Sequence, residues 1–165
     1  MKTRIILCGA CGKMGGNVLS LLEQDENAVA VCGVDLYPKE IGIPVYTRFA
    51  DIQEEADVII DFSSAENLEE RLSYAKKHKL GIVLASTGFT AEDIALVNEY
   101  AKSIPVFRTA NLSLGINLMQ ALVKAAAQLL GDNFDVEIIE RHHNLKKRRS
   151  QRNGAYARRL RQRGV

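Results

Sequence analysis

The fold is decided by the stretch Gly9-Ala10-Cys11-Gly12-Lys13-Met14-Gly15, which joins the apolar run Thr3–Cys8 to a helical pattern from Asn17. Three glycines at this spacing allow backbone angles that a side chain forbids, and they let the backbone approach a bound group closely. The helix that follows offers unpaired N–H groups to a phosphate. An ordinary tight turn can also be rich in glycine, but the strand before it and the helix after it favour nucleotide binding.

One cysteine lies in this stretch, and a second lies directly before it. Cys11 occupies the position of the second glycine in the common fingerprint G-x-G-x-x-G, which favours a variant Rossmann family. The spacing Cys8-x-x-Cys11 also occurs in redox and zinc sites, but no second cysteine pair is present. We therefore interpret Cys8 as a packing residue and Cys11 as a loop residue.

Size and charge limit the classes of protein that fit. The 165 residues suffice for one full domain and part of a second, and 47% hydrophobic with 25% charged residues is typical of a globular protein. We expect no secretory signal and no membrane span, and three cysteines without secretory context indicate a reducing cytoplasm. All 20 acidic residues lie at or before Glu140, whereas ten of the 22 basic residues lie from Arg141 onward.

Apolar runs alternate with helical patterns along the chain. The expected strands are Thr3–Cys8, Ala28–Asp35, Asp57–Phe62, Leu80–Ala85, a strand from Pro105, and Phe134–Glu140. The expected helices follow the glycine turn, run from Ser63 to about His78, start at a capping box at Thr90, and extend from Leu114 to Leu130. Leu36–Thr47 is expected to be a loop. The alternation predicts an α/β fold with a doubly wound, Rossmann-like parallel sheet.

Small and polar residues follow the ends of the expected strands. In such sheets ligands bind beyond the carboxyl ends of the strands. Asp35 ends its strand 20 residues after Gly15, where an acid accepts hydrogen bonds from the adenosine ribose in dinucleotide sites. Asp35 could also be a helix cap or a surface acid, but its position favours the ribose role. The other strand ends carry Asp61-Phe62-Ser63, Ser86-Thr87-Gly88 and Ala110-Asn111.

The stretch Arg141–Lys147 carries two histidines and two lysines just after an expected strand. Histidine moves protons near neutral pH, and lysine can do the same or hold a carboxylate. From chemistry alone, catalysis and a solvated basic turn are equally good interpretations. Metal binding is the least favoured, because no carboxylate or cysteine ligands accompany the histidines, and we predict no metal site.

Five motifs occur together and in order: the glycine turn, Asp61-Phe62-Ser63, Ser86-Thr87-Gly88-Phe89, Ala110–Asn117 and Glu140–Lys146. Together they resemble the 4-hydroxy-tetrahydrodipicolinate reductase (dihydrodipicolinate reductase) family of the diaminopimelate route to lysine. The resemblance covers residues 1–147. It implies a dinucleotide-binding domain over 1–112, and a linking helix and the start of an α+β substrate domain, incomplete here, over 113–147.

The resemblance also implies roles for individual residues. It implies hydride transfer from NADH or NADPH to a cyclic dicarboxylate. It also implies that Asp35 binds the adenosine ribose of the cofactor. His142 and Lys146 would be catalytic, with Lys146 the proton donor, and His143 would contact substrate. Full-length members would form homotetramers, with no nucleic-acid or membrane partner. The residues implied to bind cofactor are Gly9, Ala10, Cys11, Gly12, Lys13, Met14, Ala85, Ser86, Thr87, Thr109, Ala110, Asn111 and Leu112.

The resemblance stops after Lys147, where the family continues Asp-Ala-Pro-Ser-Gly-Thr-Ala. Here the chain has Arg148-Arg149-Ser150-Gln151-Arg152-Asn153-Gly154-Ala155. The genetic code permits the codons CGA CGC TCC CAG CGG AAC GGC G for these residues, and reading those codons from the second base would give the whole family motif. We therefore expect residues 148–165 to be an out-of-frame, disordered basic tail, and expect little turnover without the Gly-Thr pair that binds a substrate carboxylate.

Two other functions are compatible with parts of the sequence. The basic tail could bind nucleic acid, but apart from Tyr156 it lacks interleaved aromatic residues. A non-catalytic NAD(P)-binding module would need Gly9–Asp35 but not His142 and Lys146. The presence of those two residues favours reductase ancestry.

Overall fold

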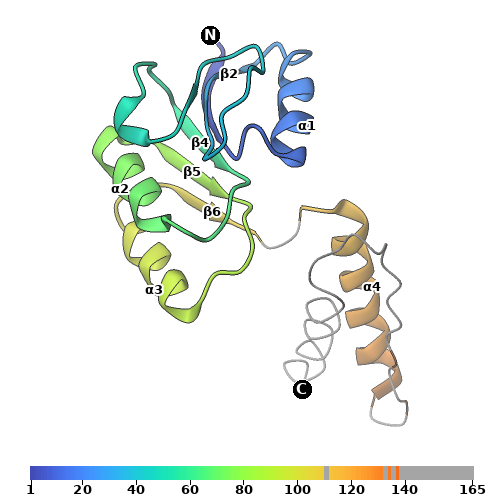
Figure 1. The fold of residues 1–165 in the computed structure, drawn as a ribbon. Coiled ribbons are helices and arrows are strands. Elements are labelled where there is room, and N and C mark those ends of the chain that lie inside the picture. Colours follow the sequence, from blue (N-terminus) through green and yellow to red (C-terminus); the bar gives the residue numbers. More distant parts are fainter. Residues whose placement is uncertain (110–111, 132–133, 135–136, 138–165) are drawn as a thin grey trace. The chain divides into compact units, whose positions relative to one another are not determined.

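The computed structural model describes residues 1–109, 112–131, 134 and 137 (Figure 1). The chain divides into two compact units, Met1–Ala110 and Asn111–Val165, and each is described by itself. In the part of the second unit that the structure describes, the regular element is one helix, α4 (Leu114–Leu130), which Ser113 caps and which stops before Gly131 at φ 63°. The predicted strand Phe134–Glu140 falls almost entirely outside the described residues.

The first unit is built on one parallel sheet of six strands in the order β3-β2-β1-β4-β5-β6. The strands are β1 (Thr3–Cys8), β2 (Ala28–Val34), β3 (Val45–Tyr46), β4 (Val58–Asp61), β5 (Gly81–Leu84) and β6 (Val106–Arg108). This order confirms the predicted doubly wound sheet, and the point where the strand order reverses lies between β1 and β4.

The helices cover both faces of this sheet. Figure 1 shows α1 (Lys13–Leu22) on one side and both α2 (Leu68–His78) and α3 (Ala91–Tyr100) on the other. The predicted capping box begins α3: the Asp93 N–H donates to the Thr90 hydroxyl at 3.1 Å, and the Thr90 N–H donates to the Asp93 carboxylate at 2.8 Å. A short 3-10 turn, η1 (Phe49–Asp51), lies between β3 and β4.

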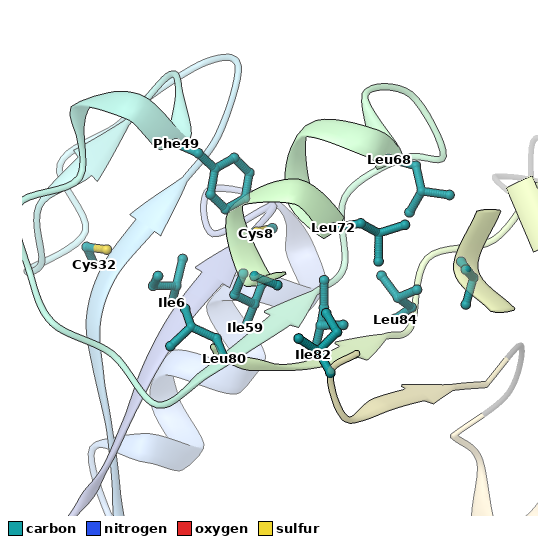
Figure 2. Close-up of a cluster of buried hydrophobic side chains, with 13 residues drawn as sticks. Ile6, Cys8, Cys32, Phe49, Ile59, Leu68, Leu72, Leu80, Ile82 and Leu84 are labelled. Atoms are coloured by element: carbon teal, nitrogen blue, oxygen red, sulfur yellow. The ribbon is translucent and has the colours of Figure 1, made fainter. Parts of the chain in front are cut away.

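The main core lies between the sheet and α2 (Figure 2). Alternate residues of the strands point toward this helix, so Ile6, Ile59 and Ile82 share one face of the sheet. On the helix side, the predicted apolar face is buried, and Leu72 is completely inaccessible to solvent. The opposite face of β1 carries Ile5 and Leu7, which are also buried.

Two sequence-based expectations about local structure were wrong. The segment Leu36–Thr47 is not wholly a loop, because Val45 and Tyr46 pair with the end of β2. The Gly33 N–H donates to the Pro44 carbonyl at 2.8 Å, and the Asp35 N–H donates to the Tyr46 carbonyl at 3.0 Å. A strand of two residues is too short to show an alternating pattern in the sequence.

The helix expected from Ser63 begins only at Leu68. The Ser63 N–H donates to the Asp61 carboxylate at 2.9 Å, which holds the chain in a turn directly after β4. Asn67, which precedes the helix, is left-handed with φ 56°. Residues 63–67 therefore form a loop beyond the end of the sheet.

The turn between β1 and α1 depends on Gly15. A Cβ atom on Gly15 would come within 2.5 Å of the Ala10 carbonyl oxygen, and closer still to that of Gly9. Gly16, the next residue in the same helix, has open space around its Cβ position. The third glycine of the turn therefore allows α1 to pack directly on the loop that precedes it.

Replacing Gly15 with alanine is expected to destabilise the protein by about 3 kcal/mol, because backbone atoms must move to admit the methyl group. The same substitution at Gly16 is the matched control, and it is expected to stabilise by about 0.5–1 kcal/mol through helix propensity. Urea unfolding of both variants measures the difference. Equal stabilities for Gly15→Ala and Gly16→Ala would contradict the packing described for the turn.

Candidate functional site

The carboxyl ends of the parallel strands bring most of the predicted site residues to one edge of the sheet. Backbone hydrogen bonds continue across this edge beyond the strands themselves. The Phe62 N–H donates to the Cys8 carbonyl at 3.0 Å, the Ala85 N–H to the Asp61 carbonyl at 2.9 Å, and the Thr109 N–H to the Leu84 carbonyl at 3.1 Å. The predicted segments Gly9–Met14 and Ala85–Thr87, with Thr109, therefore follow strands that are paired in one sheet.

The glycine turn lies at the point where the strand order reverses. Gly9 has φ +73°, and a Cβ atom there would lie 3.0 Å from the Phe62 carbonyl carbon and the Ser63 nitrogen. The turn after β1 is thus packed against the loop after β4. In doubly wound sheets, ligands bind in the crevice at this switch point.

The start of α1 is arranged to receive an anion. Gly12 is its N-cap residue and makes no side-chain capping bond, and the first turn contains no acidic residue. The exposed Gly12, Lys13 and Met14 leave this helix end open to solvent. N–H groups at an uncapped helix start, with the positive end of the helix dipole, can hold a phosphate.

Asp35 connects the end of β2 to the glycine turn. One carboxylate oxygen accepts the Cys11 N–H at 3.0 Å, and the other accepts the Tyr37 N–H at 3.0 Å. Each oxygen retains a second lone pair that can accept a hydroxyl hydrogen from a ligand. Asp35 also lines an open cleft together with Leu36, Ser63 and Arg71.

Asp61 is the other acid at a strand end, and it is completely buried. Its carboxylate accepts hydrogen bonds from the Ser63 hydroxyl at 2.5 Å and from the Ser86 hydroxyl at 3.1 Å. Its charge is balanced by Arg71 of α2, whose Nε lies 3.3 Å from the Asp61 carboxylate. The predicted residue Ser86 is therefore tied to the loop after β4 through Asp61.

Arg71 was missed by the sequence reasoning. It lies three residues after Leu68 and one before Leu72, on the face of α2 that was predicted to be apolar. A basic residue on an apolar helix face, together with an acid at the end of a core strand, was the signal available. The pairing itself depends on how α2 packs over the sheet.

The cysteines of the described residues are all free thiols. Burial raises the pKa of the Cys8 thiol, and burial together with Glu54 raises the pKa of Cys32 to about 12. Because the thiolate is the reactive and metal-binding form, both side chains act as small core residues near neutral pH. The Cys11 sulfur instead accepts a hydrogen bond at 3.3 Å from the backbone N–H of Lys39, a residue of the loop that follows β2.

Several predicted residues fall outside the described part of the chain: Ala110, Asn111, His142, His143 and Lys146. Leu112 is described but belongs to the second unit. Across residues 1–109 and the described part of the second unit, no group of three or more His, Cys, Asp or Glu side chains could hold a metal ion. None of the described helices combines the length and apolar character that a bilayer crossing requires.

Known proteins match both parts of the chain. Residues 3–112 match the family described as "Dihydrodipicolinate reductase, N-terminus", and residues 115–150 match "Dihydrodipicolinate reductase, C-terminus". A 4-hydroxy-tetrahydrodipicolinate reductase from Caldanaerobacter subterraneus is 44% identical over 147 residues, which are 89% of this chain. The match covers 58% of that relative, so this chain spans little more than half of the relative's length.

Solved structures agree in fold. A dipicolinate-bound dihydrodipicolinate reductase from Paenisporosarcina matches with a TM-score of 0.78 at 24% identity, covering 98% of this chain and 66% of that one. An oxidoreductase from Agrobacterium radiobacter, in complex with NAD+, L-tartaric acid and magnesium, matches with a TM-score of 0.62 at 17% identity, covering 77% and 41%. By sequence, the chain belongs to the dihydrodipicolinate reductase family.

Proposed function

We propose that this chain carries the cofactor-binding part of an NAD(P)H-dependent reductase that converts 4-hydroxy-tetrahydrodipicolinate to tetrahydrodipicolinate in lysine biosynthesis. One observation carries the proposal: the uncapped glycine turn is hydrogen-bonded to Asp35 at the switch point of the sheet. Family membership supplies the reaction. We place the enzyme in the cytoplasm, where this biosynthetic chemistry would occur.

The described residues fit a dinucleotide along the edge of the sheet. In this proposal the N–H groups of Gly9–Met14 bind the pyrophosphate, and Asp35 accepts hydrogen bonds from the adenosine ribose. The family resemblance assigns the nicotinamide half to Ala85–Thr87 and to residues 109–112, of which 110 and 111 lie outside the described part of the chain. The reduced dinucleotide, when bound, supplies the hydride.

The substrate side of the proposal rests on the basic residues of the second unit. His143 and its neighbours would hold a dianionic ring, since positive groups stabilise bound carboxylates. His142 and Lys146 would be the catalytic residues, with Lys146 giving up the proton that accompanies hydride addition. The full-length protein would assemble as a homo-oligomer, as implied for the family.

Replacing Gly12 with valine is expected to raise the dissociation constant for NADH at least about tenfold, because a side chain would then stand where the pyrophosphate approaches the backbone. Isothermal titration calorimetry measures this directly. The matched control is Gly16→Val in the same helix, where the added side chain has open space and NADH affinity should be unchanged. Equal NADH binding by the wild type and Gly12→Val would show that the glycine turn does not hold the pyrophosphate.

NADH is expected to bind at least as tightly as NADPH. The Asp35 carboxylate repels a 2′-phosphate, and the adjacent Leu36 provides no positive charge to offset it. Replacing Asp35 with asparagine should therefore shift the ratio of the two dissociation constants about tenfold toward NADPH. Side-by-side titrations test this, with Glu40→Gln as a control for the loss of one nearby negative charge. A clear preference of the wild-type chain for NADPH would refute the role given to Asp35.

We also propose that residues 113–147 begin the substrate domain and that 148–165 are read out of frame. The match to the family's C-terminal part ends at residue 150, which supports a change of frame near codon 148. Sequencing the encoding DNA should reveal Asp-Ala-Pro-Ser-Gly-Thr-Ala in the shifted frame.

Deleting one base near codon 148 is expected to restore reductase turnover, measured as substrate-dependent loss of NADH absorbance, because the Gly-Thr carboxylate contact returns. In that restored protein, His142→Ala should reduce turnover by on the order of a hundredfold or more. Ordinary turnover by the present chain, or DNA without the shifted motif, would contradict the frame proposal. NADH binding without turnover in the restored protein would instead indicate a non-catalytic NAD(P)-binding module.

A further inference from the structure

Arg71 holds three separate groups at the edge of the sheet while remaining almost completely buried, at 5% exposure. Its Nε lies 3.3 Å from the Asp61 carboxylate. One terminal nitrogen donates to the Ser64 carbonyl at 2.7 Å, and the other donates to the Glu66 carbonyl at 2.8 Å. A single side chain of α2 thus fixes both the end of β4 and the loop that follows it.

These contacts are an inefficient way to stabilise a core. A buried ion pair gains little net stability, because both charges lose their hydration, and apolar residues of similar volume often do as well. The Nε of Arg71 also makes no hydrogen bond despite its burial. What the arrangement does provide is a fixed path for residues 63–67, because the Ser64 and Glu66 carbonyl groups accept hydrogen bonds from the two terminal nitrogens of Arg71.

That loop forms part of the candidate cofactor site. Ser64 and Glu66 line the same open cleft as Asp35. The beginning of the loop also contacts the glycine turn, since a Cβ on Gly9 would lie 3.0 Å from the Ser63 nitrogen. A shift of residues 63–67 would therefore alter both the wall facing Asp35 and the support beneath Gly9.

We propose that Arg71 is a positioning residue for cofactor binding: through Asp61 and the carbonyl groups of Ser64 and Glu66, it holds the loop 63–67 in the conformation that completes the adenosine side of the site. This inference rests on the proposed dinucleotide function. Arg71 itself is too buried to be a main ligand for the cofactor. Its effect is on affinity, by keeping the loop in the binding-competent arrangement.

The test replaces the whole ion pair rather than one partner, because removing Arg71 alone would leave Asp61 buried and unpaired. The double variant Asp61→Asn/Arg71→Met removes both charges and the two loop contacts while keeping similar volumes. We expect it to fold, to bind NADH and ADP-ribose about tenfold more weakly, and to show faster amide hydrogen exchange over residues 62–67. If the loop has the binding conformation in only about a tenth of the molecules, the apparent dissociation constant rises about tenfold.

The matched control is the same double substitution at the other end of the sheet, Asp57→Asn/Arg4→Met. Arg4 pairs with Asp57, the residue before β4, at 2.9 Å. This ion pair lies at the end of the strands away from the glycine turn, so the control variant should bind NADH with unchanged affinity. Arg71→Lys provides a second variant if the first does not fold. The lysine ammonium can still pair with the Asp61 carboxylate. It lacks the planar guanidinium that donates to two carbonyl groups at once, so this variant should also bind NADH more weakly.

The outcomes separate the two proposals. If the wild-type chain does not bind NADH, the proposed function is wrong, and this inference falls with it. If the wild type binds NADH and the folded double variant, or Arg71→Lys, binds it equally well, Arg71 is only structural and the positioning role alone is refuted. Weaker binding with faster exchange at 62–67, absent from the Arg4 control, supports the positioning role.

Discussion

The close approach of α1 to the end of β1 is the constraint on which the rest of the edge depends. Gly15 leaves no space for a side chain against the carbonyl groups of Gly9 and Ala10, and a Cβ on Gly33 would lie 2.6 Å from the Ala10 Cβ. Glycine at these positions lets the turn fit between neighbouring strand ends. Because the turn packs closely on the sheet, the Cys11 N–H just before α1 donates to Asp35, and the backbone after β4 lies against Gly9. The candidate binding edge is a consequence of this packing.

Two aspartates lie at the carboxyl ends of strands in this sheet, and they have different roles. Asp35 is partly accessible and is held by backbone N–H groups, so its carboxylate can be shared with a ligand in the cleft. Asp61 is fully buried, and its oxygens are occupied by Ser63, Ser86 and Arg71. Position at a strand end therefore does not by itself identify a binding residue. What separates the two is whether solvent and ligand can reach the carboxylate.

Much of this arrangement could be predicted from sequence because the strands are buried on both faces and appear as continuous apolar runs, as Thr3–Cys8 does. The glycine turn and Asp35 were also predictable, since their spacing reflects local geometry. The two-residue strand β3 was not, because its pairing with β2 depends on tertiary contact. The late start of α2 was not predicted either, because it follows from the turn that Ser63 makes with Asp61 and from the left-handed Asn67. The contacts of Arg71 were not predictable because they depend on an ion pair between a helix and the sheet. The roles of His142 and Lys146 remain predictions, because these residues lie outside the described structure.

The central claim is that the edge formed by Gly9–Met14 and Asp35 binds a reduced nicotinamide dinucleotide. The most direct measurement is an NMR titration of the isotopically labelled chain with NADH, followed through the backbone amide signals. The account predicts that the largest shifts occur at Gly12, Lys13, Met14 and the Cys11 amide that bonds to Asp35, with smaller shifts across residues 63–67. Saturable shifts confined to other parts of the chain, or no shifts at millimolar NADH, would contradict it.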